Sequence, residues 1–185
     1  EECDKYQSKD SKNACIVNLA VEKKDVSICR QGPQNCYRAV WQEFPEEAVC
    51  AKIDILQQKD QCYYHVAAKR NDIGICDSIS AQLQKDACLN LISKINKDIS
   101  RCPLISNATM RDDCLSTFSI KKTIETCNMI SDSELKEKCV IDIATINRNY
   151  DLCNSLEQKD SCYSSLAIVN GDIEKCSLIT DFGMK

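Results

Sequence analysis

The residues best able to do chemistry in this chain are its 15 cysteines, which are spread along almost all of its 185 residues. Two spacings alternate between neighbouring cysteines. One is 14 residues, or 13 in a single case, whereas the other is usually 12 but falls to 7 after Cys29 and to 9 after Cys153. Together they give a repeat of about 26 residues, a period typical of stacked supersecondary units.

This spacing favours disulfides over metal binding or catalysis. A zinc site needs close pairs such as Cys-x-x-Cys, whereas no two cysteines here are nearer than 7 residues. A Cys–His or Ser–His–Asp catalytic site would have to use His65, the only histidine. Other repeats hold Leu91, Asp142 or Ser165 at that position, which predicts a surface helix residue. We therefore expect no metal, no cofactor and no enzymatic activity.

One class of cysteine is predicted to lie on a longer helix. Apolar residues follow it at offsets of one, four and often five, as Tyr63, Val66 and Ala67 follow Cys62. This is one buried helical stripe. The residue two positions before the cysteine is usually acidic, as Asp60 is, which suits a helix N-terminus.

The other class is predicted to lie on a short helix of about two turns. The residue four positions before each of these cysteines is mostly of a type that caps helices. These residues are Asp25, Glu46, Asp72, Asp98, Thr123, Asn149 and Asp172. Ile or Leu follows most of these cysteines by three positions, on the same helical face. A unit thus contains a long helix, a tight turn and a short helix.

Two disulfide registers are compatible with the spacing. Pairing across 14 residues leaves Cys3 over and pairing across the variable spacing leaves Cys176. In the first register, Cys62 and Cys76 lie at different heights from the turn near Asn71. With helices about 8 Å apart and about 1.5 Å of rise per residue, their Cα atoms are about 10 Å apart, beyond the ~7 Å limit for a disulfide.

The second register places both sulfurs at comparable distances from the turn between them. Between Cys29 and Cys36, Gly32 can end one helix and Pro33 can open the next. We therefore favour seven pairs, although sequence alone does not fix connectivity. They are Cys3–Cys15, Cys29–Cys36, Cys50–Cys62, Cys76–Cys88, Cys102–Cys114, Cys127–Cys139 and Cys153–Cys162. Cys176 is then an intermolecular link or the partner of a cysteine beyond Lys185.

The predicted disulfides point to an extracellular protein. Each closes a short loop and should stabilise by about 2 to 3 kcal/mol, which helices this short need because they are marginal alone. Such bonds persist where conditions are oxidising, and Asn107-Ala108-Thr109 is a glycosylation sequon that is usable there. The net charge of −4 and the pI near 5.1 argue against nucleic acid as a partner. No stretch approaches the ~20 apolar residues of a membrane span.

The fold expected is all-α: a single domain over residues 1–185, built as an α-solenoid of about seven disulfide-stapled helical hairpins. Segments such as Lys59-Asp60-Gln61-Cys62-Tyr63-Tyr64 and Lys159-Asp160-Ser161-Cys162-Tyr163 are its repeat signatures. The architecture resembles secreted cysteine-rich helical repeat proteins of the Sel1-like and tetratricopeptide type. That resemblance implies a scaffold for protein binding or assembly. The Trp, Leu-Gly and Tyr pattern of tetratricopeptide repeats is missing and the period is shorter.

Our leading hypothesis is an extracellular structural protein that associates head to tail with copies of itself, as in a filament, or binds other surface proteins. The chain starts in the short-helix half of one unit at Cys3 and stops in that of another at Cys176, and open ends can associate. The alternative is a monomeric secreted module that recognises a protein or peptide without catalysis. A secreted enzyme would require a pocket that gathers acidic residues from distant repeats.

Overall fold

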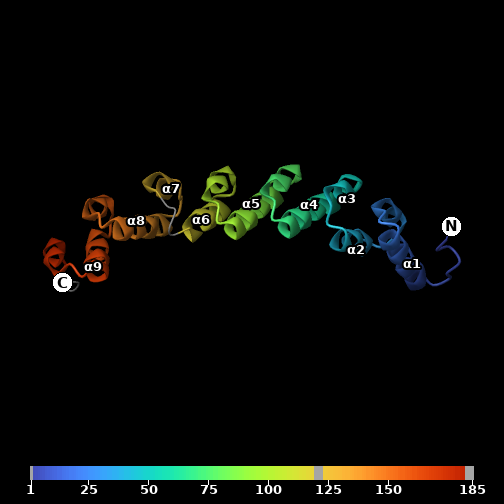
Figure 1. The fold of residues 1–185 in the computed structure, drawn as a ribbon, viewed down its shortest axis with the longest axis horizontal. Coiled ribbons are helices and arrows are strands. Elements are labelled where there is room, and N and C mark those ends of the chain that lie inside the picture. Colours follow the sequence, from blue (N-terminus) through green and yellow to red (C-terminus); the bar gives the residue numbers. More distant parts are fainter. Residues whose placement is uncertain (1, 119–122, 182–185) are drawn as a thin grey trace. The chain divides into compact units, whose positions relative to one another are not determined.

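Long and short helices alternate along the chain, as the sequence predicts. A computed structural model describes residues 2–118 and 123–181, and these contain 14 helices and no strand (Figure 1). The long helices are α1 (Lys9–Glu22), α2 (Asn35–Glu43), α4 (Leu56–Arg70), α5 (Gln82–Asn96), α6 (Ala108–Thr117), α8 (Ser133–Asn147) and α9 (Lys159–Asn170). The short helices are η1 (Val26–Gln31), α3 (Glu47–Ala51), η2 (Ile73–Ser78), η3 (Ile99–Leu104), α7 (Ile124–Asn128), η4 (Tyr150–Ser155) and η5 (Ile173–Leu178). The fold is an all-α, disulfide-stapled repeat array.

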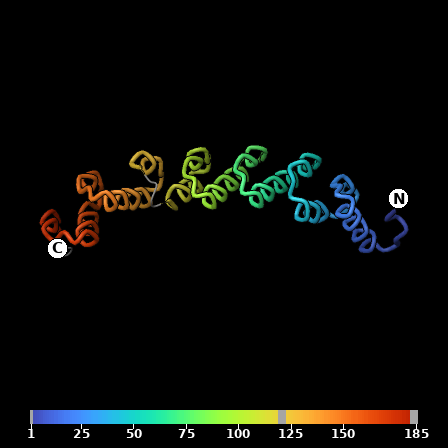
Figure 2. The backbone as a smooth tube through the Cα atoms, in the orientation of Figure 1, coloured from blue at the N-terminus to red at the C-terminus, as the bar shows by residue number. Residues whose placement is uncertain are grey.

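Contacts within the chain group its residues into two compact units, Glu1–Asn96 and Lys97–Lys185. Within each unit, a long helix packs against the short helices that precede and follow it, and neighbouring long helices pack together, as α4 does with α5 and α8 with α9. Figure 2 follows the backbone through the reversals between short and long helices. A single domain over the whole chain stays a prediction.

Side chains cap most of the short helices, at the positions predicted. The Asp72 carboxylate accepts a hydrogen bond from the Gly74 N–H at 2.9 Å, and Asp25, Asp98, Thr123 and Asn149 cap in the same way. Each cap satisfies a first-turn N–H that lacks a partner inside the helix. Glu46 and Asp172 make no such bond.

Most long helices end at a residue in the left-handed backbone conformation. Lys24, Asn71, Lys97, Arg148 and Gly171 have φ between 51° and 65°. After four of them the next N–H donates to the carbonyl of a small buried residue, and these residues are Ala20, Ala67, Ala144 and Ala167. This arrangement satisfies carbonyls at the helix end and turns the chain into the next short helix.

The core of each unit is built around the cysteines. Of the 14 cysteines that form disulfides, 13 are buried and Cys15 is half-buried. The residue three positions after the short-helix cysteine is an isoleucine in five repeats, and Ile53, Ile79, Ile105, Ile130 and Ile179 are all buried. Trp41 is also buried, at the helix position where most other repeats have Ala. Disulfides and a few branched side chains thus replace a large aromatic core.

Candidate functional site

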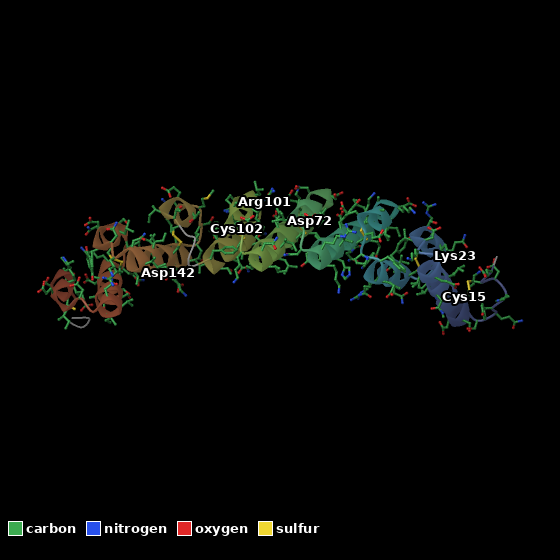
Figure 3. All side chains as sticks on the ribbon, in the orientation of Figure 1. Cys15, Lys23, Asp72, Arg101, Cys102 and Asp142 are labelled. Atoms are coloured by element: carbon green, nitrogen blue, oxygen red, sulfur yellow. A yellow bond between two sulfur atoms is a disulfide. The ribbon has the colours of Figure 1, made fainter. Side chains whose placement is uncertain are left out.

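Seven disulfides fix the two helices of each hairpin. They join Cys3 to Cys15, Cys29 to Cys36, Cys50 to Cys62, Cys76 to Cys88, Cys102 to Cys114, Cys127 to Cys139 and Cys153 to Cys162. The Cα atoms in each pair are 5.4–5.7 Å apart, a normal separation for a disulfide. Six of these bonds tie a short helix to the long helix that follows; the first ties the segment before α1 to α1, where Figure 3 marks Cys15. These are the pairs that the sequence favours.

Cys176 lies on η5 and is half-buried, and it has no disulfide partner among residues 2–118 and 123–181. It packs against the core cluster of Ala144, Cys153, Cys162 and Leu166. Its predicted link to another cysteine, within or between chains, stays a prediction.

Most acidic residues two positions before a long-helix cysteine lie one turn inside their own helix, contrary to our expectation, whereas Asp160 lies in the first turn of α9. Asp60 lies one turn inside α4 and is 1% exposed. Its carboxylate accepts hydrogen bonds from the backbone N–H groups of Ser80 and Ala81, at 3.0 and 2.8 Å. These groups precede α5, so Asp60 stabilises the start of the next long helix rather than of its own.

The same link recurs in the second unit. Asp112 is buried and accepts from the N–H groups of Ser131 and Asp132 at 3.0 Å. Asp160 accepts from the N–H groups of Thr180 and Asp181 at 3.1 and 2.8 Å. The Thr180 hydroxyl also donates to this carboxylate, and these bonds lower the pKa of Asp160. The acids of the repeat therefore join neighbouring hairpins.

His65 is half-buried on α4, rather than fully on the surface. It lines a hollow of about 310 Å³ together with Arg38, Gln42, Tyr64 and Gln84, and Trp41 and Gln61 complete the lining. Burial lowers the pKa of His65, and the positive charges of Lys69 and Arg38 lower it further. The lining contains no carboxylate or thiol.

A larger groove of about 730 Å³ lies between α8 and α9 in the second unit. Ile141 lies at its apolar part and packs against the core, while Ile146 and Val169 are 60% and 67% exposed. Its charged lining is mostly acidic: Glu134, Glu137, Asp142 and Glu157 contribute carboxylates and Lys138 is the one cation among the lining residues. Figure 3 marks Asp142 on α8. This apolar and acidic groove is the best candidate for a binding site.

The groove was not predicted from the sequence, although one feature of the sequence pointed to it. The residue seven positions after the long-helix cysteine is charged in four repeats, as Glu22, Glu43, Lys69 and Lys121. It is apolar in three others, as Ile95, Ile146 and Val169, and all three are more than half exposed. Ile146 and Val169 both line the groove, so their apolar side chains at this position were the available signal.

Asn107, the residue of the sequon, is half-buried at the start of α6. Its side-chain oxygen caps that helix by accepting from the Met110 N–H at 3.0 Å. Glycosylation would take place on the side-chain nitrogen, and it stays a prediction.

Comparison with protein-family models, with curated proteins and with solved structures found no match to this chain. Among the residues described, no helix is both long enough and apolar enough to cross a lipid bilayer. The candidate site must therefore be interpreted from its own chemistry.

Proposed function

We propose that this protein is an extracellular, non-catalytic scaffold that binds proteins, either copies of itself or other surface proteins. The observation that carries the proposal is the groove between α8 and α9, which exposes Ile146 and Val169 on helices that disulfides hold in place. A rigid helical surface loses little conformational entropy when a partner binds. Exposed apolar side chains on such a surface favour a protein partner.

The disulfides support an extracellular location. Seven of them lie in 185 residues, and 13 of their 14 cysteines are buried where they hold the core together. The glutathione pool of the cytosol would keep most such thiols reduced, whereas secretion allows them to oxidise. The likeness to Sel1-like and tetratricopeptide-type proteins is part of this proposal, because it rests on the repeated helical hairpins alone.

The turn between α9 and η5 supports association between copies. Ile173 is 83% exposed, whereas Val26, at the same repeat position, is 1% exposed. Ile168 and Val169 are also exposed nearby in sequence. A helix from a second copy could cover Ile173 as Val26 is covered in its own unit, and such a heterologous contact builds open chains of subunits.

Sedimentation velocity over a range of concentrations, with electron microscopy in oxidising buffer, tests the proposal. We expect association that increases with concentration and that weakens in the double variant Ile168→Ser, Ile173→Ser. Ile95→Ser is the matched control, because Ile95 is also exposed but lies on α5. A protein that remains monomeric at every concentration and that binds no protein or peptide would contradict the proposal.

A monomeric recognition module is the second candidate, and the acidic character of the α8–α9 groove favours it, because like charges oppose contact between identical surfaces. It predicts a monomer in sedimentation together with binding of a partner at that groove. The two candidates differ in the partner and share the extracellular, non-catalytic role.

A further inference from the structure

The α8–α9 groove has an apolar part that the fold itself leaves uncovered. Ile146 and Val169 come from neighbouring long helices and both line the groove, with the half-buried Ile141 beside them. Because Ile146 and Val169 are mostly exposed, they contribute little to folding and much of their surface remains available to a ligand. A ligand that fits here must bring apolar side chains of its own.

The charge of the groove restricts the ligand further. Four carboxylates and one ammonium group line it, so the local charge is negative. Glu134 and Glu157 are exposed, so their carboxylates are open to a charged partner at the rim. Polyanions and acidic peptides would be repelled, whereas Lys and Arg side chains would be attracted.

Three of the four carboxylates, those of Glu134, Asp142 and Glu157, do not come from the acidic position of the repeat, which Glu137 occupies. The hollow of the first unit shares several long-helix positions with the groove, since Gln84 and Gln158 each lie four residues before a long-helix cysteine and His65 and Asp142 each lie three residues after one. That hollow is lined by Arg38, His65, Tyr64 and glutamines, without a carboxylate. The acidic lining is therefore a property of the α8–α9 groove alone among these two surfaces.

We infer that the α8–α9 groove binds a peptide segment of a partner protein in which apolar side chains are flanked by Lys or Arg. The inference rests on the proposed protein-binding function and specifies its partner. The apolar side chains contact Ile146 and Val169, which provide most of the affinity. The basic side chains pair with Glu134 and Glu157 at the rim and speed association.

Four synthetic peptides of about 15 residues test the inference by fluorescence anisotropy with the intact, oxidised chain. Three carry Leu along one helical face and Lys, Gln or Glu at the remaining positions. The fourth keeps the Lys residues and replaces Leu by Ser. We expect the Leu–Lys peptide to bind tightest, the Leu–Gln peptide more weakly and the other two not measurably, and we expect the affinity for the Leu–Lys peptide to fall as salt is added.

Two double variants locate the binding. Ile146→Ser with Val169→Ser should weaken binding of the Leu–Lys peptide about tenfold or more. Glu134→Gln with Glu157→Gln should weaken it about fivefold and leave the Leu–Gln peptide unaffected. Ile95→Ser, at the corresponding repeat position of α5, should change neither. Circular dichroism and the count of disulfides by mass verify that each variant is folded.

Equal or tighter binding of the Leu–Glu peptide, equal binding of the Ser–Lys peptide, or indifference to both double variants would overturn the inference. If no peptide binds while sedimentation shows association of copies, the inference fails and the scaffold function stands. If neither peptide binding nor association is found, both fail.

Discussion

The hollow of the first compact unit and the groove of the second share several repeat positions and differ in chemistry. In the first unit the hollow gathers His65, Trp41 and several amides, whereas the α8–α9 groove of the second gathers carboxylates and exposed Ile and Val. The cysteines, the caps and the acids that join hairpins recur in both units. The comparison separates a repeated framework, which determines the fold, from variable positions on the long helices, which give each surface its chemistry.

Removal of one disulfide should have the largest effect on stability, because the disulfides belong to the repeated framework. Replacing Cys76 and Cys88 together by Ala should lower the free energy of unfolding by about 3 kcal/mol, because the bond closes a loop in the unfolded chain and fills the core. Urea unfolding measures the loss. Ile146→Ser, a change in the variable positions, should cost no more than about 0.5 kcal/mol. Equal losses in the two variants would contradict the separation.

Loss of the acid that joins neighbouring hairpins should have the second largest effect on stability. Asp60→Ala leaves the N–H groups of Ser80 and Ala81 without their acceptor in a partly buried site. We expect a loss of about 2 kcal/mol and faster hydrogen exchange at both amides. Glu134→Gln is the matched control, since it changes an exposed carboxylate of the groove. An Asp60→Ala variant as stable as the control would show that the acids do not belong to the framework.

The residues that end the long helices allow one stabilising and one destabilising substitution. Arg148 and Gly171 end α8 and α9 with φ of 51° and 65°. Because a side chain is strained in this conformation, Arg148→Gly should stabilise and Gly171→Ala should destabilise, each by about 1 kcal/mol. Thermal unfolding of the two variants measures the effect. If both variants changed the stability in the same direction, the left-handed conformation of these two residues would be contradicted.

Ser93 provides a test of the repeated framework, because it departs from the residue found at its position in most other repeats. It is buried at a position where four other repeats have Ala, and its hydroxyl has no hydrogen-bond partner among the described residues. Ser93→Ala should therefore raise the free energy of unfolding by about 1 kcal/mol, as measured by urea unfolding. Loss of stability would show that the hydroxyl is satisfied in solution.

The smallest expected effect is the pH dependence of the link made by Asp160. Because folding lowers the pKa of this carboxyl, its bonds stabilise the fold above the unfolded pKa, and this contribution disappears as the pH falls through the lowered value. Hydrogen exchange at the Thr180 and Asp181 amides should speed up in that acidic range. In Asp160→Asn this change should be missing; if it persists, another group is responsible.

The sequence predicted the parts of the structure that depend on neighbours along the chain. Cysteine spacing, capping residues such as Asp72 and the apolar stripe after Cys62 all act within one hairpin, and the alternating helices follow from them. Gly32 shows the limit: it ends η1 as predicted but has φ of −106°, and an added Cβ would lie 2.6 Å from the Ile16 side chain. A close contact with α1, rather than a left-handed turn, requires glycine there.

The contacts between hairpins were not predictable in the same way. Asp60 recurs in the pattern, but its bond to Ala81 joins residues 21 apart in sequence. The α8–α9 groove likewise depends on which faces of two helices the packing leaves open. Ile146 and Val169 could be identified as exposed only once α8 and α9 were placed side by side. Periodicity alone treats such residues as core.

The pairing of the cysteines is the foundation of this account, and peptide mapping of the native, unreduced protein by mass spectrometry tests it most directly. We expect the seven bridges of the structure, with Cys62 joined to Cys50 and Cys88 to Cys76. A bridge between Cys62 and Cys76, or free thiols at these four positions, would contradict the framework and the extracellular function proposed from it.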